Sequence, residues 1–176
     1  MIKLELMKEE DFSKVVQWNK GKSKDFLVQW AGPALEYPLT EDKLREFFKE
    51  YNMPNETSRL LFKIILENSG EMVGIIEIRK YEKESNTGRV GRFLIGEETV
   101  RGKGIGAAAL REVVRMGFEK LKYDKICLGV FDFNKSAIVC YKKVGFQIDR
   151  LTEKYVEVSD GYWNLYDMSI SKANFK

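Results

Sequence analysis

The sequence contains no histidine and only two cysteines, Cys127 and Cys140, among its 176 residues. Because histidine is absent, Ser-His-Asp and Cys-His nucleophilic catalysis and any histidine-ligated metal site are excluded, and we expect no metal. The cysteines are not spaced as Cys-x-x-Cys, so they are predicted to be reduced thiols of a protein in a reducing compartment. The chemistry must therefore come from other residue types.

Long apolar runs are also absent. No segment approaches the roughly 20 apolar residues of a membrane span, and the N-terminal MIKLELMKEED lacks the apolar core of a signal peptide. The formal net charge of +3 is too small to indicate nucleic-acid binding. Hydrophobic residues at 44% and charged residues at 32% are typical of a soluble globular protein. We therefore expect a cytoplasmic protein that binds neither a membrane nor nucleic acid.

Apolar periodicity and turn residues predict one mixed α/β domain over residues 1–176, without an internal repeat or linker. In the middle of the chain, two apolar runs joined through NSG and a third run after Asn86 predict an antiparallel meander. The segment 21–39 shows no clear period, and an irregular loop of this length is usually functional or mobile. The predicted strands are 2–7, 60–67, 72–78, 87–96, 125–131 and a final pair around SDG at 159–161, and the predicted helices are about 12–19, 40–51, 104–121 and 134–144.

The stretch RGKGIG at 101–106 combines glycines with cations and indicates an anion-binding turn before a helix. A P-loop needs a glycine five residues before Gly102 and Ser or Thr after the Lys, and neither is present. A dinucleotide fold is the runner-up, since Gly102, Gly104 and Ala107 fit G-x-G-x-x-A and Asp132 follows the next strand. The antiparallel strands upstream and the short remainder downstream oppose it. The third candidate is a coenzyme A pyrophosphate loop.

A second motif begins 28 residues after Gly106. NKSAIVCYKKVGF at 134–146 fits N-x-x-A-x-x-x-Y-x-x-x-G-F, and RGKGIG fits R/Q-x-x-G-x-G/A. With the predicted strand order, these motifs resemble the GNAT superfamily of N-acetyltransferases, nearest its ribosomal-protein and small-amine branches. The resemblance implies a central, mostly antiparallel sheet of about seven strands with about four helices. It also implies acetyl-CoA as cosubstrate and direct acetyl transfer to a primary amine (a protein N-terminus or side chain, or a small amine) in a ternary complex.

The resemblance assigns roles to individual residues. The amides of 102–107 would hold the pyrophosphate, and the end of the preceding strand would pair with the pantetheine amides. Tyr141 would protonate the departing thiolate, since a phenol is a proton donor at neutral pH. Asn134 would contact the cofactor, although capping of its helix is the simpler interpretation. The predicted cofactor-binding residues are Leu94, Ile95, Gly96, Arg101, Gly102, Lys103, Gly104, Ile105, Gly106, Ala107, Asn134, Tyr141 and Lys143.

The base that deprotonates the amine is not supplied by the family pattern. Gly129 stands where ribosomal-protein acetyltransferases carry a Glu, and this departure leaves both the base and the substrate of this chain open. Glu77, an acid among isoleucines, is the predicted catalytic base, and a cross-strand pair with Arg92 is its alternative interpretation. Glu97 and deprotonation through water are further alternatives. Acyl transfer through Cys140 is disfavoured because no histidine activates the thiol.

Aromatic residues are the candidates for the acceptor pocket. Trp30 and Tyr37 of the irregular segment 21–39 are predicted to contact the substrate, because loops carry specificity. Tyr162 and Trp163 of the final hairpin are further candidates. A catalytically silent coenzyme A-binding sensor on the same fold is the alternative function; the retained tyrosine of the second motif argues against it. Since family members often dimerise, the resemblance also allows a homodimer through the final strand.

Overall fold

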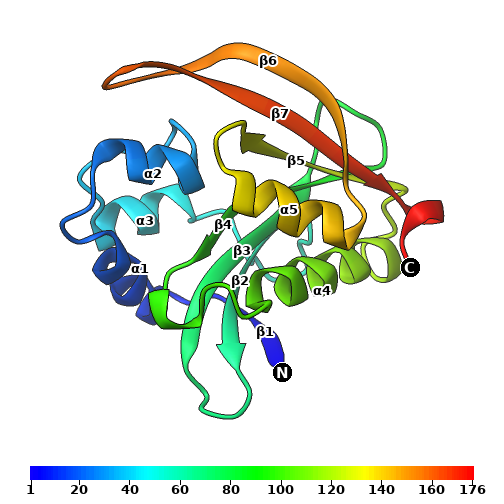
Figure 1. Cartoon of the computed structure of the whole chain (residues 1–176). Coiled ribbons are helices and arrows are strands. Elements are labelled where there is room, and N and C mark those ends of the chain that lie inside the picture. Colours follow the sequence, from blue (N-terminus) through cyan, green and yellow to red (C-terminus); the bar gives the residue numbers. More distant parts are fainter.

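The computed structural model describes all residues from 1 to 176, and they form one seven-stranded sheet with helices on both faces (Figure 1). The strands run in the order β1-β2-β3-β4-β5-β7-β6. The seven-stranded, mostly antiparallel sheet confirms the predicted mixed α/β fold. The structure has five α-helices, one more than predicted. The strands are β1 (Ile2–Leu6), β2 (Arg59–Leu66), β3 (Met72–Lys80), β4 (Thr87–Ile95), β5 (Lys125–Phe131), β6 (Gln147–Val158) and β7 (Gly161–Ser171), and the helices are α1 (Phe12–Asn19), α2 (Lys24–Ala31), α3 (Glu41–Phe47), α4 (Ile105–Glu119) and α5 (Lys135–Val144).

The sheet divides between β4 and β5. Strands β1 to β4 form an antiparallel meander, as the apolar runs predicted, and β5, β7 and β6 form a second antiparallel group. The two groups meet in the one parallel pair, which holds only from Thr87 opposite Lys125 to Arg89 opposite Cys127. Beyond Arg89 the two strands diverge. One main-chain edge of β4 is therefore left without a strand partner along most of its length.

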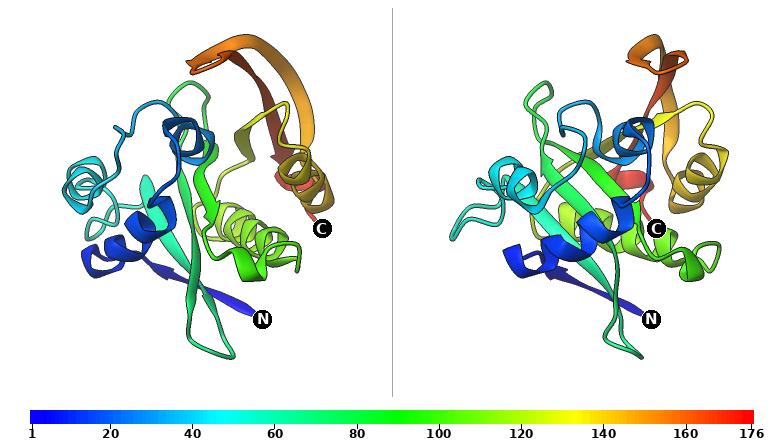
Figure 2. Two further views of the ribbon diagram at one scale, coloured as in Figure 1. Left: turned by 60° about the vertical axis from the view of Figure 1, so that its left-hand side comes forward. Right: turned by 90° about the vertical axis from the view of Figure 1, so that its left-hand side faces the viewer.

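Helices cover both faces of the sheet. Figures 1 and 2 show α1, α2 and α3 on one face, and α4 with α5 on the other. Successive strand side chains point to opposite faces, so Ile75 of β3 packs in the core beneath α1–α3, whereas Ile76 and Ile78 pack in the larger core beneath α4. This explains why β3 reads as a continuous apolar run rather than an alternating one.

Helix α2 lies in the segment 21–39, so the prediction that this segment is irregular is wrong. Ser23 caps the helix, its Oγ accepting the N–H of Phe26 at 3.1 Å. Leu27, Trp30 and Ala31 are buried on one side of it. The helix is short, so these tertiary contacts rather than its intrinsic propensity hold it.

The ends of the other helices differ in how they are capped. Asn134 caps α5 as expected, Thr40 caps α3, and Gly145 ends α5 in the left-handed region at φ 114°. Asp11 precedes α1, but its side chain does not cap the helix. Its carboxylate instead accepts the N–H of Lys8 at 2.9 Å and pairs with Lys63 at 3.0 Å. These two contacts occupy both oxygens of the Asp11 carboxylate.

The long β6–β7 hairpin arches away from the sheet toward α2 (Figures 1 and 2). Its tip is tied to α2 by a hydrogen bond from Ser159 to Asp25. A small cluster of Val28, Phe131 and Leu165 joins α2, β5 and β7 beneath the arch. The hairpin therefore closes one end of the gap between β4 and β5. None of the helices combines the length and apolar character needed to cross a membrane.

Candidate active site

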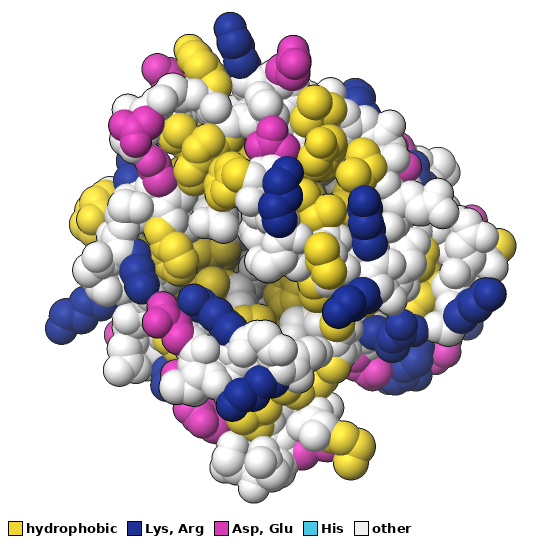
Figure 3. Space-filling model, viewed as in Figure 1, with side chains coloured by type: hydrophobic (Ala, Val, Ile, Leu, Met, Phe, Trp, Pro, Cys, Tyr) yellow, Lys and Arg dark blue, Asp and Glu magenta, His cyan; other side chains and the backbone are white.

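A cleft with a volume of about 630 Å³ occupies the gap between β4 and β5. Figure 3 shows it as a hollow with an apolar floor, between the α1–α3 side of the molecule and α5. At one end it is lined by the loop before α4 and by α5, and at the other by α2. Its lining residues are Phe26, Gln29, Trp30, Val90, Gly91, Arg92, Phe93, Leu94, Ile95, Val100, Arg101, Gly102, Gly104, Ile105, Gly106, Ala107, Leu128, Gly129, Val130, Phe131, Asn134, Ser136, Ala137, Val139, Cys140, Tyr141 and Lys143.

The wall formed by β4 contains a bulge. Ile75 of β3 faces Leu94, whereas Glu77 faces Gly91, so β4 has one residue more than β3 between these pairs. The extra length is absorbed at Arg92, which has a left-handed φ of 40°. Such a bulge bends the strand and disturbs the regular pairing of its main-chain groups.

Of the three predicted residues at the end of β4, Leu94 and Ile95 line the cleft and Gly96 does not. The N–H of Gly96 bonds to the carbonyl of Val73 at 2.9 Å, so it is not free for a ligand. A Cβ at this position would lie 2.0 Å from the ring of Trp18. Gly96 is therefore explained by close packing of an indole rather than by cofactor binding.

The loop before α4 presents a run of free main-chain donors. No N–H group from Gly102 to Ala107 has an acceptor in the protein, and the first bond of the helix is from Ala108 to Gly104. Gly102 and Gly104 have φ values of 75° and 80°, and no atom lies within 4 Å of a Cβ built on either. Glycine is required by this conformation, and the space in front of it is open to an anion at the helix N-terminus.

The three cations predicted to bind the cofactor differ in their position relative to the cleft. Arg101 lines the cleft, but its Nε donates to the carbonyl of Ile95 at 2.9 Å and its guanidinium pairs with Glu98 at 3.4 Å. It therefore ties the loop to the end of β4. Lys103 is exposed and lies outside the cleft, whereas Lys143 of α5 lines it. Lys143 is thus the predicted cation that the structure brings to this end of the cleft without a local carboxylate partner.

Helix α5 contributes Asn134 and Tyr141 to the cleft. Asn134 Oδ1 accepts the N–H of Ala137 at 3.3 Å, so capping occupies at least part of this side chain. The Tyr141 ring stacks on Phe93 of β4 with centroids 6.2 Å apart, and its hydroxyl has no hydrogen-bond partner in the protein. Burial raises the pKa of Tyr141 above the usual phenol value, and the Cys140 thiol adds to this. The phenol therefore stays protonated across the neutral range.

Glu77 is fully buried on the α3 side of the sheet and does not line the cleft. Its carboxylate lies 3.0 Å from Arg79 Nε and 3.2 Å from an Arg92 guanidinium nitrogen. Burial raises its pKa, against the opposing effect of Arg92 and Arg79. The cross-strand pair with Arg92, offered above as the alternative interpretation, is present. The geometry separates Glu77 from the space where an amine could bind.

No other carboxylate replaces the family's missing acid. A Cβ on Gly129 would lie 3.1 Å from both Arg89 and Leu165, so a longer side chain does not fit here without displacing them. Glu97 lies outside the cleft, 3.9 Å from Lys14. No Asp or Glu side chain lines the cleft at all.

The two predicted acceptor residues separate in the structure. Trp30 lines the cleft from α2, and its indole Nε1 donates to Asn19 at 3.0 Å. Tyr37 does not line it; it borders a different cavity of about 470 Å³ beside α1, together with Lys20 and Leu39. Trp30 is part of α2, whereas Tyr37 follows the turn after this helix, which leads it to a different surface.

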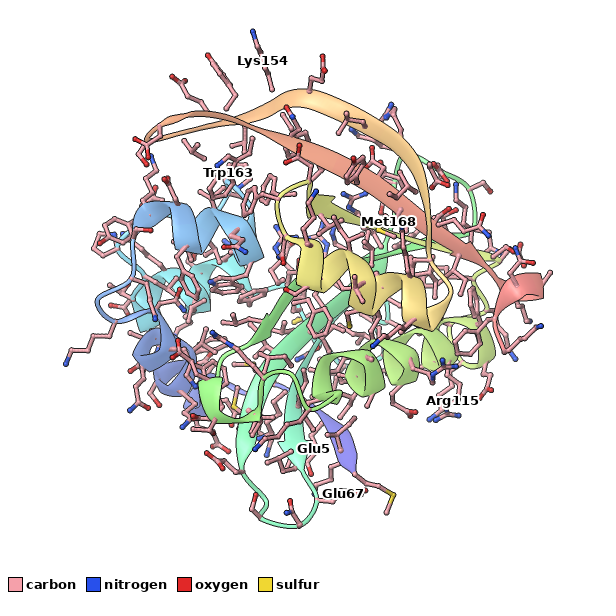
Figure 4. All side chains as sticks on the ribbon, in the orientation of Figure 1. Glu5, Glu67, Arg115, Lys154, Trp163 and Met168 are labelled. Carbon is pink, nitrogen blue, oxygen red and sulfur yellow. The ribbon has the colours of Figure 1, made fainter.

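The two candidate residues of the β6–β7 hairpin, Tyr162 and Trp163, also lie in different surroundings. In Figure 4, Lys154 points outward from the arch, whereas Trp163 lies on its inner side toward α2. The Trp163 ring packs edge-on against Phe131 and Phe133, with centroids 4.9 and 4.6 Å apart. Tyr162 is 55% exposed and takes no part in this cluster. Trp163 thus supports the Phe131 wall of the cleft from behind.

Four residues that line the acceptor end are not among the predicted site residues: Phe26, Gln29, Arg92 and Phe93. The first two lie on α2, for which Ser23 and the apolar spacing after it were an available signal. Arg92 was named only as a partner of Glu77. Its left-handed conformation at a bulge left no pattern in the sequence, because Gly and Asn, rather than Arg, mark that conformation.

Comparisons with known proteins agree with this geometry. Residues 2–147 match the model of the family described as "Acetyltransferase (GNAT) domain". The chain is 26% identical over 144 residues to the SPbeta prophage-derived uncharacterized N-acetyltransferase YokL of Bacillus subtilis, covering 81% of this chain and 77% of the relative. It is 30% identical over 102 residues to the L-amino acid N-acetyltransferase AaaT of Escherichia coli, covering 57% and 62%.

The fold is similar to that of a spermidine N-acetyltransferase from Vibrio cholerae solved in complex with CoA and spermine, with a TM-score of 0.80 at 17% identity over 98% of this chain and 96% of the other. The chain therefore belongs to the GNAT acetyltransferase family. Its activity is the acetyl-CoA-dependent N-acetylation of amines.

Proposed function

We propose that the cleft holds acetyl-CoA with its pyrophosphate against the main-chain N–H groups of residues 102–107. The observation that carries this assignment is the run of N–H groups without an acceptor, which opens onto free space at the start of α4. An anion would satisfy these donors and interact favourably with the helix dipole. Acetyl-CoA, when bound, supplies the acetyl group as an activated thioester.

The chain's own groups then position the reaction. The unpaired edge of β4 beyond Arg89 offers main-chain groups to the amides of the pantetheine arm, in the manner of an added strand. Tyr141 holds a proton on its hydroxyl for the departing sulfur, because burial keeps the phenol neutral. Holding the amine and the thioester together in one cleft supplies much of the acceleration. No covalent enzyme intermediate is needed.

The amine loses its proton to water in this mechanism. A primary amine of the lysine type has a pKa of about 10.4 and is mostly protonated at neutral pH. Since the cleft has no lining carboxylate, we favour a water chain over a dedicated base. Glu77 stays a prediction as the base, to be tested by substitution. A base role requires that Glu77→Gln lower the rate and abolish the acidic limb of the pH–rate profile.

The experiment that tests the function measures thiol release from acetyl-CoA with a panel of amines (amino acids, polyamines, peptides and aminoglycosides). Calorimetric titration with CoA is done on the same protein. We expect CoA binding and amine-dependent thiol release. Absence of CoA binding contradicts the proposal, and binding without turnover on any amine favours a silent coenzyme A-binding sensor. The Tyr141 hydroxyl, free of protein partners beside Phe93, argues against that alternative.

Assembly as a homodimer is a separate proposal. Strand β6 forms the free edge of the sheet, with Ile148, Leu151 and Tyr155 at least 40% exposed along it. An exposed edge strand is able to pair with a second copy. Sedimentation at several protein concentrations distinguishes a dimer from a monomer.

A further inference from the structure

The charged side chains that line the cleft are all cationic. They are Arg92, Arg101 and Lys143, and no Asp or Glu accompanies them. Arg101 and Lys143 belong to the loop and to α5, at the end assigned above to phosphate. Arg92 lies on β4 at the bulge, toward α3 rather than toward that loop, since its guanidinium sits 5.0 Å from the Phe47 ring. One cation therefore remains for the end of the cleft where the acceptor enters.

Arg92 adjoins, along β4, the residue that contacts the predicted acid Tyr141. It is the neighbour in sequence of Phe93, whose ring stacks on Tyr141, and consecutive Cα atoms are about 3.8 Å apart. The residue adopts a φ of 40°, a conformation that is unfavourable for a non-glycine residue. The fold retains this backbone strain at a position that faces the cleft, which is common at functional sites.

The surroundings of Arg92 leave positive charge unneutralised. Glu77 is the carboxylate in contact with it, at 3.2 Å, and Glu77 is shared with Arg79 at 3.0 Å. Two guanidinium groups and one carboxyl group carry a net charge of +1 if Glu77 is ionised and +2 if it is protonated. In either state, a positively charged acceptor group meets repulsion at this site.

Arg92 also has an unused donor. Its Nε–H is buried and has no hydrogen-bond partner, while its side chain as a whole is 17% exposed. This nitrogen is closed to solvent, so a ligand reaches the exposed part of the Arg92 side chain instead. A carboxylate is the group that a guanidinium binds best, through two parallel hydrogen bonds.

We propose that Arg92 is a specificity-determining residue, which selects acceptor amines that also carry a carboxylate, such as amino acids, over polyamines. This inference rests on the proposed acetyltransferase function. The carboxylate of the acceptor pairs with Arg92, and its amine is thereby directed toward the stack of Phe93 and Tyr141. The absence of any lining carboxylate removes the partners that a polyamine would need.

The test compares three acceptors with acetyl-CoA: L-leucine, L-leucinamide and spermidine. Leucine and its amide share a side chain and differ in the carboxylate, so the ratio of their kcat/KM values reports on carboxylate recognition. We expect Arg92→Gln to lower that ratio about tenfold to a hundredfold, the range for a lost charged hydrogen-bonded pair. The change should lie in the KM for leucine, and Arg92→Lys should give an intermediate ratio.

The matched control is Arg59→Gln, which removes a guanidinium that pairs with Glu50, away from Glu77, and does not line the cleft. It should leave the ratio within about twofold of wild type. Circular dichroism confirms that each variant is folded, and Arg92→Lys carries the test if Arg92→Gln fails to fold. An unchanged ratio in the Arg92 variants, or a wild-type preference for spermidine, overturns the inference alone. Absence of transfer to every amine overturns the proposed function, and this inference with it.

Discussion

The two ends of the cleft are built in different ways. The end before α4 consists of consecutive main-chain N–H groups in one short loop, residues 102–107. The other end consists of side chains that come from distant segments: Trp30 of α2, Arg92 of β4 and Phe131 of β5. A main-chain site depends on local backbone conformation, whereas a side-chain site depends on which elements the fold brings together. The first kind leaves a motif in the sequence and the second does not.

The largest expected effect on the rate is that of a substitution at Tyr141. We expect Tyr141→Phe to lower kcat about a hundredfold or more while CoA affinity is kept, because it removes one proton donor. Since the pKa of Tyr141 is raised by burial, the wild-type acid stays protonated as pH rises through the usual phenol value of about 10. Single-turnover kinetics and CoA titration measure the two quantities.

Tyr123→Phe is the control for this prediction. Burial also raises the pKa of Tyr123, but it packs at the corner between α4 and β5, outside the cleft. Its loss of a hydroxyl should leave kcat unchanged. An equal loss of rate in both variants contradicts the role of Tyr141.

The stability of the protein should depend more on the buried Glu77, which supports the acceptor end, than on an exposed ion pair. Glu77→Gln removes the buried counter-charge of Arg92 and Arg79, which are themselves partly exposed, so we expect the free energy of unfolding to fall by about 1–3 kcal/mol. Glu112→Gln breaks an exposed pair with Arg115 and should cost less than about 1 kcal/mol. Urea denaturation of both variants makes the comparison. Equal costs contradict the view that this end rests on a buried network.

Gly96 tests whether the end of β4 is a packing or a binding position. A Cβ in Gly96→Ala would clash with Trp18, and overpacking of this kind costs about 1–3 kcal/mol. We therefore expect a lower melting temperature with unchanged CoA affinity at a temperature where the variant is folded. A variant of wild-type stability that binds CoA weakly would restore Gly96 to the cofactor site.

Gly104 tests the main-chain end. Gly104→Val and Gly70→Val both place a side chain at a positive φ with no atom within 4 Å of the new Cβ, so each should lose about 1–2 kcal/mol of stability. Only Gly104 faces the cleft. Its variant should therefore also lose about tenfold in CoA affinity, the loss expected when one charged hydrogen bond is blocked. Matched losses of affinity would contradict the assignment of the loop.

Prediction from the sequence was correct where the signal was local. RGKGIG predicted free amides at a helix start, Asn134 predicted a cap, and the apolar runs predicted the seven strands. The prediction was wrong for α2. The segment 21–39 has no apolar period over its whole length, but a short helix capped by Ser23 lies within it. Consequently Tyr37 was placed with Trp30, whereas the turn after α2 carries it to another cavity.

By itself, the sequence determined the fold and the main-chain loop, since backbone conformation and apolar periodicity are properties of neighbouring residues. Only the tertiary structure decided the acceptor end. There, Glu77 turned out to be buried behind β4 and Arg92 to face the cleft. The physical reason is the bulge: one additional residue in β4 shifts the pairing with β3 and changes which side chains reach the cleft.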